Sequence, residues 1–196
     1  MPAQVMGLLA TRLRRSGYRV HLFAYRSLAA TLEDNARQLA AFVREQDGAP
    51  IHLVGHSLGG LVILQALQIQ PDLVSGRIVL LGSPVNGSSV ARRLQRSRGL
   101  SWLLGRSGQH GLLGDGPAWR GHLQLGVIAG ERALGIGQVI GGLTGDNDGT
   151  VSVAETRLEH ASGSVRINTT HMGLLVSREV ADEVCHFLKH GQFSRG

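Results

Sequence analysis

The stretch Ile51-His52-Leu53-Val54-Gly55-His56-Ser57-Leu58-Gly59-Gly60 decides the fold of this 196-residue chain and points to its chemistry. It holds the pattern Gly-x-Ser-x-Gly between an apolar, strand-like segment at 51–54 and an apolar, helix-like segment at 60–67. A serine on so sharp a strand-to-helix turn sits in strained backbone, and its hydroxyl stands clear of the sheet. We predict that a side chain at the position of Gly55 or Gly59 would clash across the turn, which would explain why both residues are glycines.

The placement of this turn predicts a nucleophile at Ser57. The helix that follows the serine directs its N-terminal amides toward the place where an oxyanion would form. The alternative interpretation is a glycine-rich turn that only closes a strand–helix unit. The strand before the turn and the helix after it favour the nucleophile.

Length and composition indicate one globular domain over residues 1–196. The chain is 42% hydrophobic, and it contains no apolar run near the ~18 residues that a membrane span requires. Cys185 is the only cysteine, so an intrachain disulfide is excluded. The apolar stretch at 5–10 is too short for a signal peptide, and arginines follow it instead of preceding it. We therefore expect a cytoplasmic protein.

The net charge is +6, and nearly all of the basic residues are arginines, with Lys189 the only lysine. A basic balance can indicate nucleic acid or anionic lipid as a partner. Aromatic residues make up only 4% of the chain, and none are interleaved with basic residues along a helix. We expect no nucleic-acid partner.

Apolar segments with strand character alternate with amphipathic segments along the chain. The predicted strands cover Tyr18–Phe23, Ile51–Val54, Ile78–Leu81, Leu123–Ile128 and Val165–Ile167. Helices are expected at Val5–Arg15, after the capping residue Thr31, after Ser57 and over Arg178–Lys189. This alternation predicts an α/β fold with a mostly parallel, doubly wound sheet, in which function collects at the carboxyl ends of the strands.

Residues 86–121 interrupt this alternation. The segment is rich in glycine, serine and arginine, and it carries the apolar groups Trp102-Leu103-Leu104 and Leu112-Leu113. The functional interpretation is a small lid, or cap, that contributes apolar surface for an acyl chain. The alternative is a solvated helix and loop without a role in substrate binding.

A serine hydroxyl needs a histidine that takes its proton. His171 is the predicted base among nine histidines, because it lies in the loop after the last predicted strand. His56 adjoins the serine and must point away from it, so we predict a packing residue there. Three other histidines lie in a strand, on the last helix or near the tail: His52, His186 and His190.

The histidine in turn needs a carboxylate, expected in the loop after the preceding strand. That loop is Gly145-Asp146-Asn147-Asp148-Gly149-Thr150-Val151. Asp148 is favoured over Asp146 because the sequence turns directly from it into apolar residues. Glu155 and Asp115 are more distant candidates. Both aspartates could also serve an Asx-turn, and calcium binding has weak support because two carboxylates form no full set of oxygen ligands.

The resulting order Ser57, Asp148, His171 is the order found in α/β-hydrolases. The sequence resembles this superfamily, specifically bacterial lipases and esterases with a GHSLGG elbow, which residues 55–60 match one for one. The segment Asn147-Asp148-Gly149 is similar to the segment that carries the acid in such lipases, and His171 follows 23 residues later. The resemblance implies hydrolysis of a carboxylic ester without a metal or organic cofactor, with the backbone N–H of Leu58 as one oxyanion donor.

The chain departs from the family pattern at its start. Family members begin with a strand that ends in a His-Gly motif, whose loop gives the second oxyanion amide. Here the segment Val5–Arg15 directly precedes Tyr18, and no His-Gly lies before it. We therefore expect a sheet that lacks the N-terminal strand, with a slot between the strands at 18–23 and 51–54. A chain shortened at its N-terminus and a compact variant both explain this pattern.

Two functions from different classes follow. The first is a serine hydrolase, esterase-like or lipase-like, with a small-molecule or lipid ester as substrate and transient contact with a lipid surface. Thioester cleavage, amide cleavage and acyl transfer would use the same residues. The second is a non-catalytic or impaired binding module, because losing one oxyanion donor costs on the order of 10²–10³ in turnover.

Overall fold

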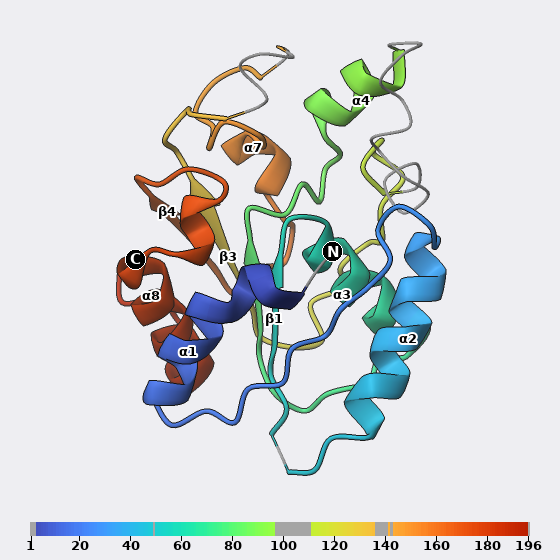
Figure 1. Cartoon of the computed structure of the whole chain (residues 1–196), viewed down its shortest axis with the longest axis vertical. Coiled ribbons are helices and arrows are strands. Elements are labelled where there is room, and N and C mark those ends of the chain that lie inside the picture. Colours follow the sequence, from blue (N-terminus) through green and yellow to red (C-terminus); the bar gives the residue numbers. More distant parts are fainter. Residues whose placement is uncertain (1–2, 49, 97–110, 136–140, 142, 196) are drawn as a thin grey trace.

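The computed structural model describes residues 3–48, 50–96, 111–135, 141 and 143–195 (Figure 1). These residues form a four-stranded sheet in the order β1-β2-β3-β4, and every pair of neighbours is parallel. The strands are β1 (Leu53–His56), β2 (Ile78–Leu81), β3 (Leu125–Gly130) and β4 (Gly163–Ile167). The predicted α/β fold with a mostly parallel sheet is confirmed.

Helices cover both faces of the sheet. The helical elements are η1 (Ala3–Met6), α1 (Gly7–Arg15), α2 (Leu32–Arg44), α3 (Leu58–Ile69), α4 (Ser89–Arg96), α7 (Val153–Thr156), η3 (Gly173–Leu175) and α8 (Arg178–His190). Figure 1 shows α2 and α3 on one side of the strands and α1 and α8 on the other. None of the helices in the described part of the chain is long and apolar enough to cross a membrane.

The two hydrophobic cores explain why the central strands contain almost only apolar residues. Leu80 and Val127 pack with α2 and α3, whereas their neighbours Leu81 and Ile128 pack with α1 and α8. Because successive side chains of a strand point to opposite faces, both sets must be apolar in a sheet that helices cover on both sides. The all-buried pattern of β2 and β3 reflects this double burial.

Local signals fix the start of α2 as predicted. The Thr31 side chain accepts a hydrogen bond from the backbone N–H of Asp34, and the Asp34 side chain accepts one from the backbone N–H of Thr31. This reciprocal pair is a capping box, which satisfies two amides that a helix start would otherwise leave without partners.

The prediction of a strand at Tyr18–Phe23 is wrong. This segment has no ladder pairing in the described structure, and β1 is the edge strand. Tyr18 packs edge-on against His52, and Phe23 packs against Phe42 of α2, so side chains separate the segment from β1. A cavity of about 170 Å³ lies between them, lined on one side by His21 and its neighbours and on the other by β1.

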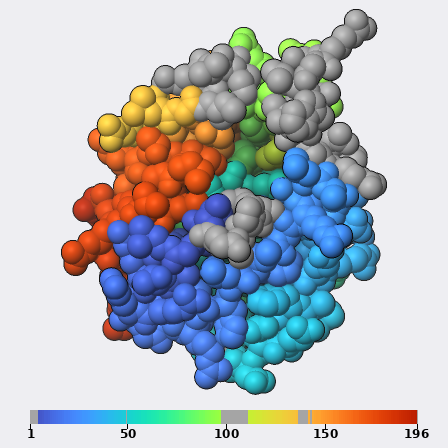
Figure 2. Space-filling model, viewed as in Figure 1, coloured from blue at the N-terminus to red at the C-terminus, as the bar shows by residue number. Residues whose placement is uncertain are grey.

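The described residues add no strand on this open side of β1, in agreement with the predicted lack of an N-terminal strand there. In Figure 2 the chain from α1 to α2, coloured blue to cyan, covers the lower half of this face. Contacts between side chains therefore hold the segment at 18–25 where a hydrogen-bonded strand would otherwise lie.

The predicted lid at 86–121 falls partly on residues 97–110, which lie outside the described residues. Its described parts are α4 and the segment 111–121. Figure 1 shows α4 at the same end of the sheet as the start of α3, beyond the carboxyl ends of the strands.

Candidate active site

The turn between β1 and α3 has the strained geometry that a nucleophile elbow requires. Ser57 has φ 54° and ψ −127°, a left-handed conformation that residues other than glycine rarely adopt. Its backbone N–H donates to the carbonyl of Leu81 at 2.9 Å, and its own carbonyl accepts from the N–H of Gly60 at 3.0 Å. These two bonds hold the strained residue between β2 and the first turn of α3.

Steric demand explains two of the glycines around Ser57. A Cβ on Gly55 would stand 2.7 Å from Ile63 Cδ1 and 2.8 Å from the backbone nitrogen of Gly60. A Cβ on Gly60 would stand 2.1 Å from Ser83 Oγ. At Gly59 the atom nearest to an added Cβ would be Tyr25 Oη at 3.7 Å, an ordinary contact. The predicted clash at Gly59 is therefore wrong, and the clash occurs at Gly60 instead.

His171 and Asp148 meet at the carboxyl ends of the strands. The Nδ1 atom of His171 lies 2.7 Å from Oδ2 of Asp148, and both side chains are buried. The second carboxylate oxygen, Oδ1, accepts hydrogen bonds from the backbone N–H groups of Thr150 and Val151. The carboxylate accepts from Nδ1–H, which leaves Nε2 of His171 with a lone pair that can take a proton.

The other candidate carboxylates have different partners. Asp146 forms an exposed salt bridge with Arg166 at 3.2 Å. Glu155 caps α7 and accepts from the backbone N–H of Ser89, and Asp115 accepts from the backbone N–H of Gly111. No group of three or more His, Cys, Asp or Glu side chains that could hold a metal ion occurs within the described ranges.

Strand β2 links the serine to the acid and the base. Leu81, which accepts from the N–H of Ser57, is followed by Gly82. A Cβ on Gly82 would stand 3.1 Å from Asp148 Oδ2 and 3.2 Å from His171 Nδ1.

In the described structure the Ser57 hydroxyl makes no hydrogen bond to His171. Such bonds are often long in a free enzyme and shorten in the substrate complex.

Comparison with known proteins identifies the family of the chain. The family model described as "Alpha/beta hydrolase family" matches residues 2–183. The chain belongs to the alpha/beta hydrolase family. No curated protein matches it.

Solved structures of a lipase, a phospholipase and a carboxyl esterase share the fold. The mature lipase BlEst2 of Bacillus licheniformis is 22% identical, with a TM-score of 0.78 over 97% of this chain and 87% of that one. Phospholipase PlaB of Legionella pneumophila, in complex with thio-NAD, is 18% identical, with a TM-score of 0.71 over 95% and 54%. The metagenomic carboxyl esterase MGS0156 is 19% identical, with a TM-score of 0.62 over 83% and 57%. At these identities the likeness concerns the fold.

In this alpha/beta hydrolase His56 makes a contact with His171 that the sequence did not predict. Its ring is buried, as predicted for a packing residue, yet its Nε2 atom lies 2.9 Å from the backbone oxygen of His171. The centroids of the two imidazole rings are 4.5 Å apart. A polar side chain at the end of a mostly buried strand requires a hydrogen-bond partner, and this general signal, though not the identity of the partner, was present in the sequence.

The predicted oxyanion donor lies at the start of the helix. Leu58 is the first residue of α3, directly after Ser57. Its backbone N–H is one of those at a helix N-terminus that have no partner within the helix. The positive end of the helix dipole favours negative charge at this place.

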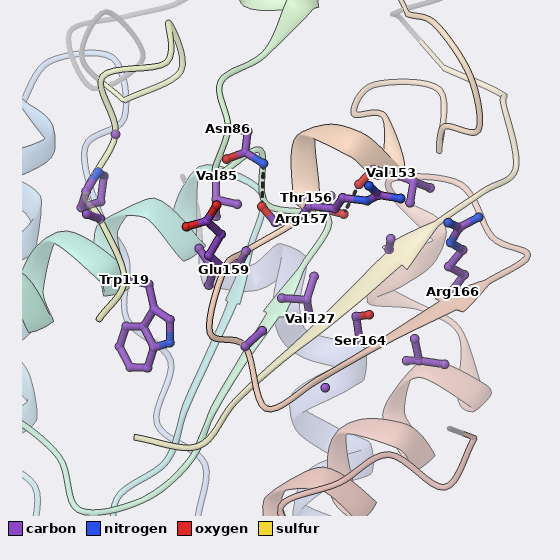
Figure 3. Close-up of a pocket in the computed structure, with 18 of the residues that line it drawn as sticks. Val85, Asn86, Trp119, Val127, Val153, Thr156, Arg157, Glu159, Ser164 and Arg166 are labelled. Carbon is purple, nitrogen blue, oxygen red and sulfur yellow. Dashed lines mark hydrogen bonds between the residues drawn. The ribbon is translucent and has the colours of Figure 1, made fainter. Parts of the chain in front are cut away.

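A large cavity in the described structure lies apart from these residues. It has a volume of about 900 Å³, and none of Ser57, Asp148 and His171 lines it. Figure 3 shows Val127 of β3 beside Ser164 and Arg166 of β4 along its wall, with Trp119 on the other side.

Proposed function

We propose that this alpha/beta hydrolase cleaves carboxylic esters through an acyl-enzyme on Ser57. The observation that carries the proposal is the bond of 2.7 Å between buried His171 and Asp148, next to a serine held at positive φ. A structural ion pair alone would not explain a strained serine at the same end of the sheet. Strain of this kind persists where function requires it.

The proposed reaction uses only groups of the chain and water. His171 Nε2 takes the proton of Ser57, whose oxygen attacks the ester carbonyl. The backbone N–H of Leu58 donates to the tetrahedral oxyanion. Protonated His171 then gives its proton to the leaving alcohol, and a water activated by the same histidine releases the acid. No metal or organic cofactor takes part.

The substrate class is a small-molecule or lipid ester. The names of the structural neighbours, a lipase, a phospholipase and a carboxyl esterase, support an ester. We further propose a single domain over residues 1–196, in which the segment 86–121 acts as a cap near the acyl chain. The position of α4 beyond the carboxyl ends of the strands supports this cap (Figure 1).

A second candidate is a binding module that uses the same site residues without turnover. The open edge of β1 favours it, because in this family the strand expected there would carry the second oxyanion donor. Losing one such donor lowers turnover by about 10²–10³ without removing the nucleophile. Labelling of the serine and catalytic turnover therefore have to be measured separately.

The test is reaction of the chain with a fluorophosphonate probe, beside the variants Ser57→Ala and Ser164→Ala. We expect labelling that is lost in Ser57→Ala and kept in Ser164→Ala, which removes an exposed serine of β4. A series of p-nitrophenyl esters of increasing acyl length then measures turnover. A folded chain that is not labelled would overturn the hydrolase, and labelling without turnover would favour the binding module.

A further inference from the structure

His56 is a buried polar side chain with one defined bond. It ends β1 directly before Ser57, and only 3% of its surface is exposed. Its Nε2 atom lies 2.9 Å from the backbone oxygen of His171. A carbonyl oxygen can only accept, so Nε2 carries the proton and the imidazole acts as a donor.

The other ring nitrogen keeps His56 neutral. Its Nδ1 atom is buried and has no hydrogen-bond partner in the described part of the chain. Protonation would place a second N–H group where no acceptor lies. Burial, together with the nearby His171, lowers the pKa of His56 to about 4. The ring is therefore a neutral donor at neutral pH, and it adds no second charge beside His171 when that residue takes up a proton.

The bond from His56 adds to two other hydrogen bonds that hold His171. The backbone N–H of His171 donates to the carbonyl of Asp148 at 2.9 Å, and its backbone carbonyl accepts from His56. Its side chain donates from Nδ1 to the Asp148 carboxylate. The acid thus holds the base on one side, and the residue next to the nucleophile holds it on the other.

We propose that His56 is a positioning residue whose bond to the His171 carbonyl sets the place of the base relative to Ser57. The inference rests on the proposed function, because it concerns the same triad. His56 is covalently bonded to Ser57, so its bond ties the nucleophile to the loop that carries the base. A misplacement of about 1 Å between reacting groups can cost on the order of 10² in rate.

Two variants separate the hydrogen bond from the packing of the ring. In His56→Gln the amide nitrogen reaches about as far as Nε2 and can donate to the His171 carbonyl. In His56→Asn the shorter amide ends near the place of Nδ1 and cannot. We expect His56→Gln to keep kcat within about threefold, and His56→Asn to lose roughly 10- to 100-fold in kcat with KM within about twofold.

The matched control is His52→Asn, which makes the same change four residues earlier. His52 Nδ1 accepts from the backbone N–H of Arg77 at 2.8 Å and has no contact with the triad, so kcat should not change. Proton NMR gives a readout besides turnover. The low-field signal of His171 Nδ1–H should stay sharp in wild type and His56→Gln and should broaden in His56→Asn.

Full activity in His56→Asn would overturn the positioning role, and so would equal losses in two folded variants, His56→Gln and His56→Asn. An unlabelled wild-type chain would instead overturn the proposed hydrolase. In that case the NMR signal still decides whether His56 holds His171, so the two failures can be told apart. Circular dichroism of each variant establishes that the protein measured is folded.

Discussion

The carboxylate of Asp148 is shared between the base and the backbone of its own loop. One oxygen lies 2.7 Å from His171 Nδ1, and the other accepts from the N–H groups of Thr150 and Val151 at 2.9 and 2.8 Å. The two backbone donors fix which oxygen faces the histidine. The loop that looks like a simple Asx-turn in the sequence therefore also orients the base.

Replacing Asp148 by Asn should reverse the tautomer of His171. The amide oxygen would keep the two backbone donors, so the amide NH₂ would face Nδ1 of the histidine. Nδ1 would then have to accept, which puts the proton on Nε2, where it can no longer take the proton of Ser57. We expect kcat to fall on the order of 10⁴, as in other serine hydrolases with this change.

Turnover of a p-nitrophenyl ester by Asp148→Asn measures this loss. The control is Asp146→Asn, which removes only the exposed pair with Arg166 and should leave kcat within about twofold. If Asp146→Asn proved the more damaging variant, the acid would be Asp146 and the present assignment would be wrong.

Gly60 and Gly59 should respond differently to the same substitution. A Cβ at residue 60 meets Ser83 Oγ at 2.1 Å and Ser83 Cβ at 2.7 Å, whereas a Cβ at residue 59 meets nothing closer than 3.7 Å. We expect Gly60→Ala to lower the free energy of unfolding by about 1–3 kcal/mol, the usual cost of overpacking. Gly59→Ala should change it by less than about 1 kcal/mol.

Urea denaturation of the two variants measures this difference. The double variant Gly60→Ala/Ser83→Gly provides the control, because it removes both Ser83 atoms that the new Cβ would meet. It should recover part of the loss. Equal stability of Gly59→Ala and Gly60→Ala would contradict the packing described here.

The sequence predicted the parallel sheet and the order of its elements because these depend on short-range patterns. A short apolar run such as 78–81 is typical of a buried strand, and Thr31 with Asp34 marks a helix start. The same patterns predicted the strained turn at Ser57. Residues next to such features could be assigned to a strand, a helix or a turn without knowing the tertiary structure.

The errors arose where a long-range contact decides the outcome. Tyr18–Phe23 alternates like a strand, but it becomes one only if a neighbouring strand supplies hydrogen bonds, and β1 is not close enough. His56 is buried as predicted, but its hydrogen bond was not predicted, because its partner is a carbonyl 115 residues later in the chain. Periodicity within a window of the sequence carries no information on either contact.

The buried His56 predicts a dependence of stability on pH. Its pKa is about 4 in the folded chain and 6.5 in the unfolded chain. Between these values the unfolded chain binds a proton that the folded chain does not, so the free energy of unfolding falls as the pH falls. The free energy of unfolding has its full value above pH 6.5 and falls as the pH approaches 4. The total decrease due to His56 is on the order of 3 kcal/mol.

Urea denaturation of wild type and His56→Gln from pH 4 to 7 tests this dependence. The glutamine does not titrate, so stability should depend less on pH in the variant. His52 also has a lowered pKa and acts in the same direction, which is why the difference between the two proteins matters. Parallel curves would mean that His56 titrates normally in the folded protein.

Gly82 should be essential to the base rather than to the fold. Its φ is +52°, and a Cβ there would meet Leu174 Cδ1 at 2.7 Å and the Asp148–His171 pair at 3.1 and 3.2 Å. Gly82→Ala should push these two side chains out of line and lower the rate of fluorophosphonate labelling by at least tenfold.

Gly114→Ala is the matched control, because Gly114 also has a positive φ, +107°, but no atom lies within 4 Å of its Cβ position. Both variants carry the backbone strain of a side chain at positive φ, so a loss of labelling confined to Gly82→Ala would be due to the contacts of its Cβ with Leu174, His171 and Asp148. Equal labelling rates would show that the pair tolerates a methyl group at this distance and does not need the close packing of β2.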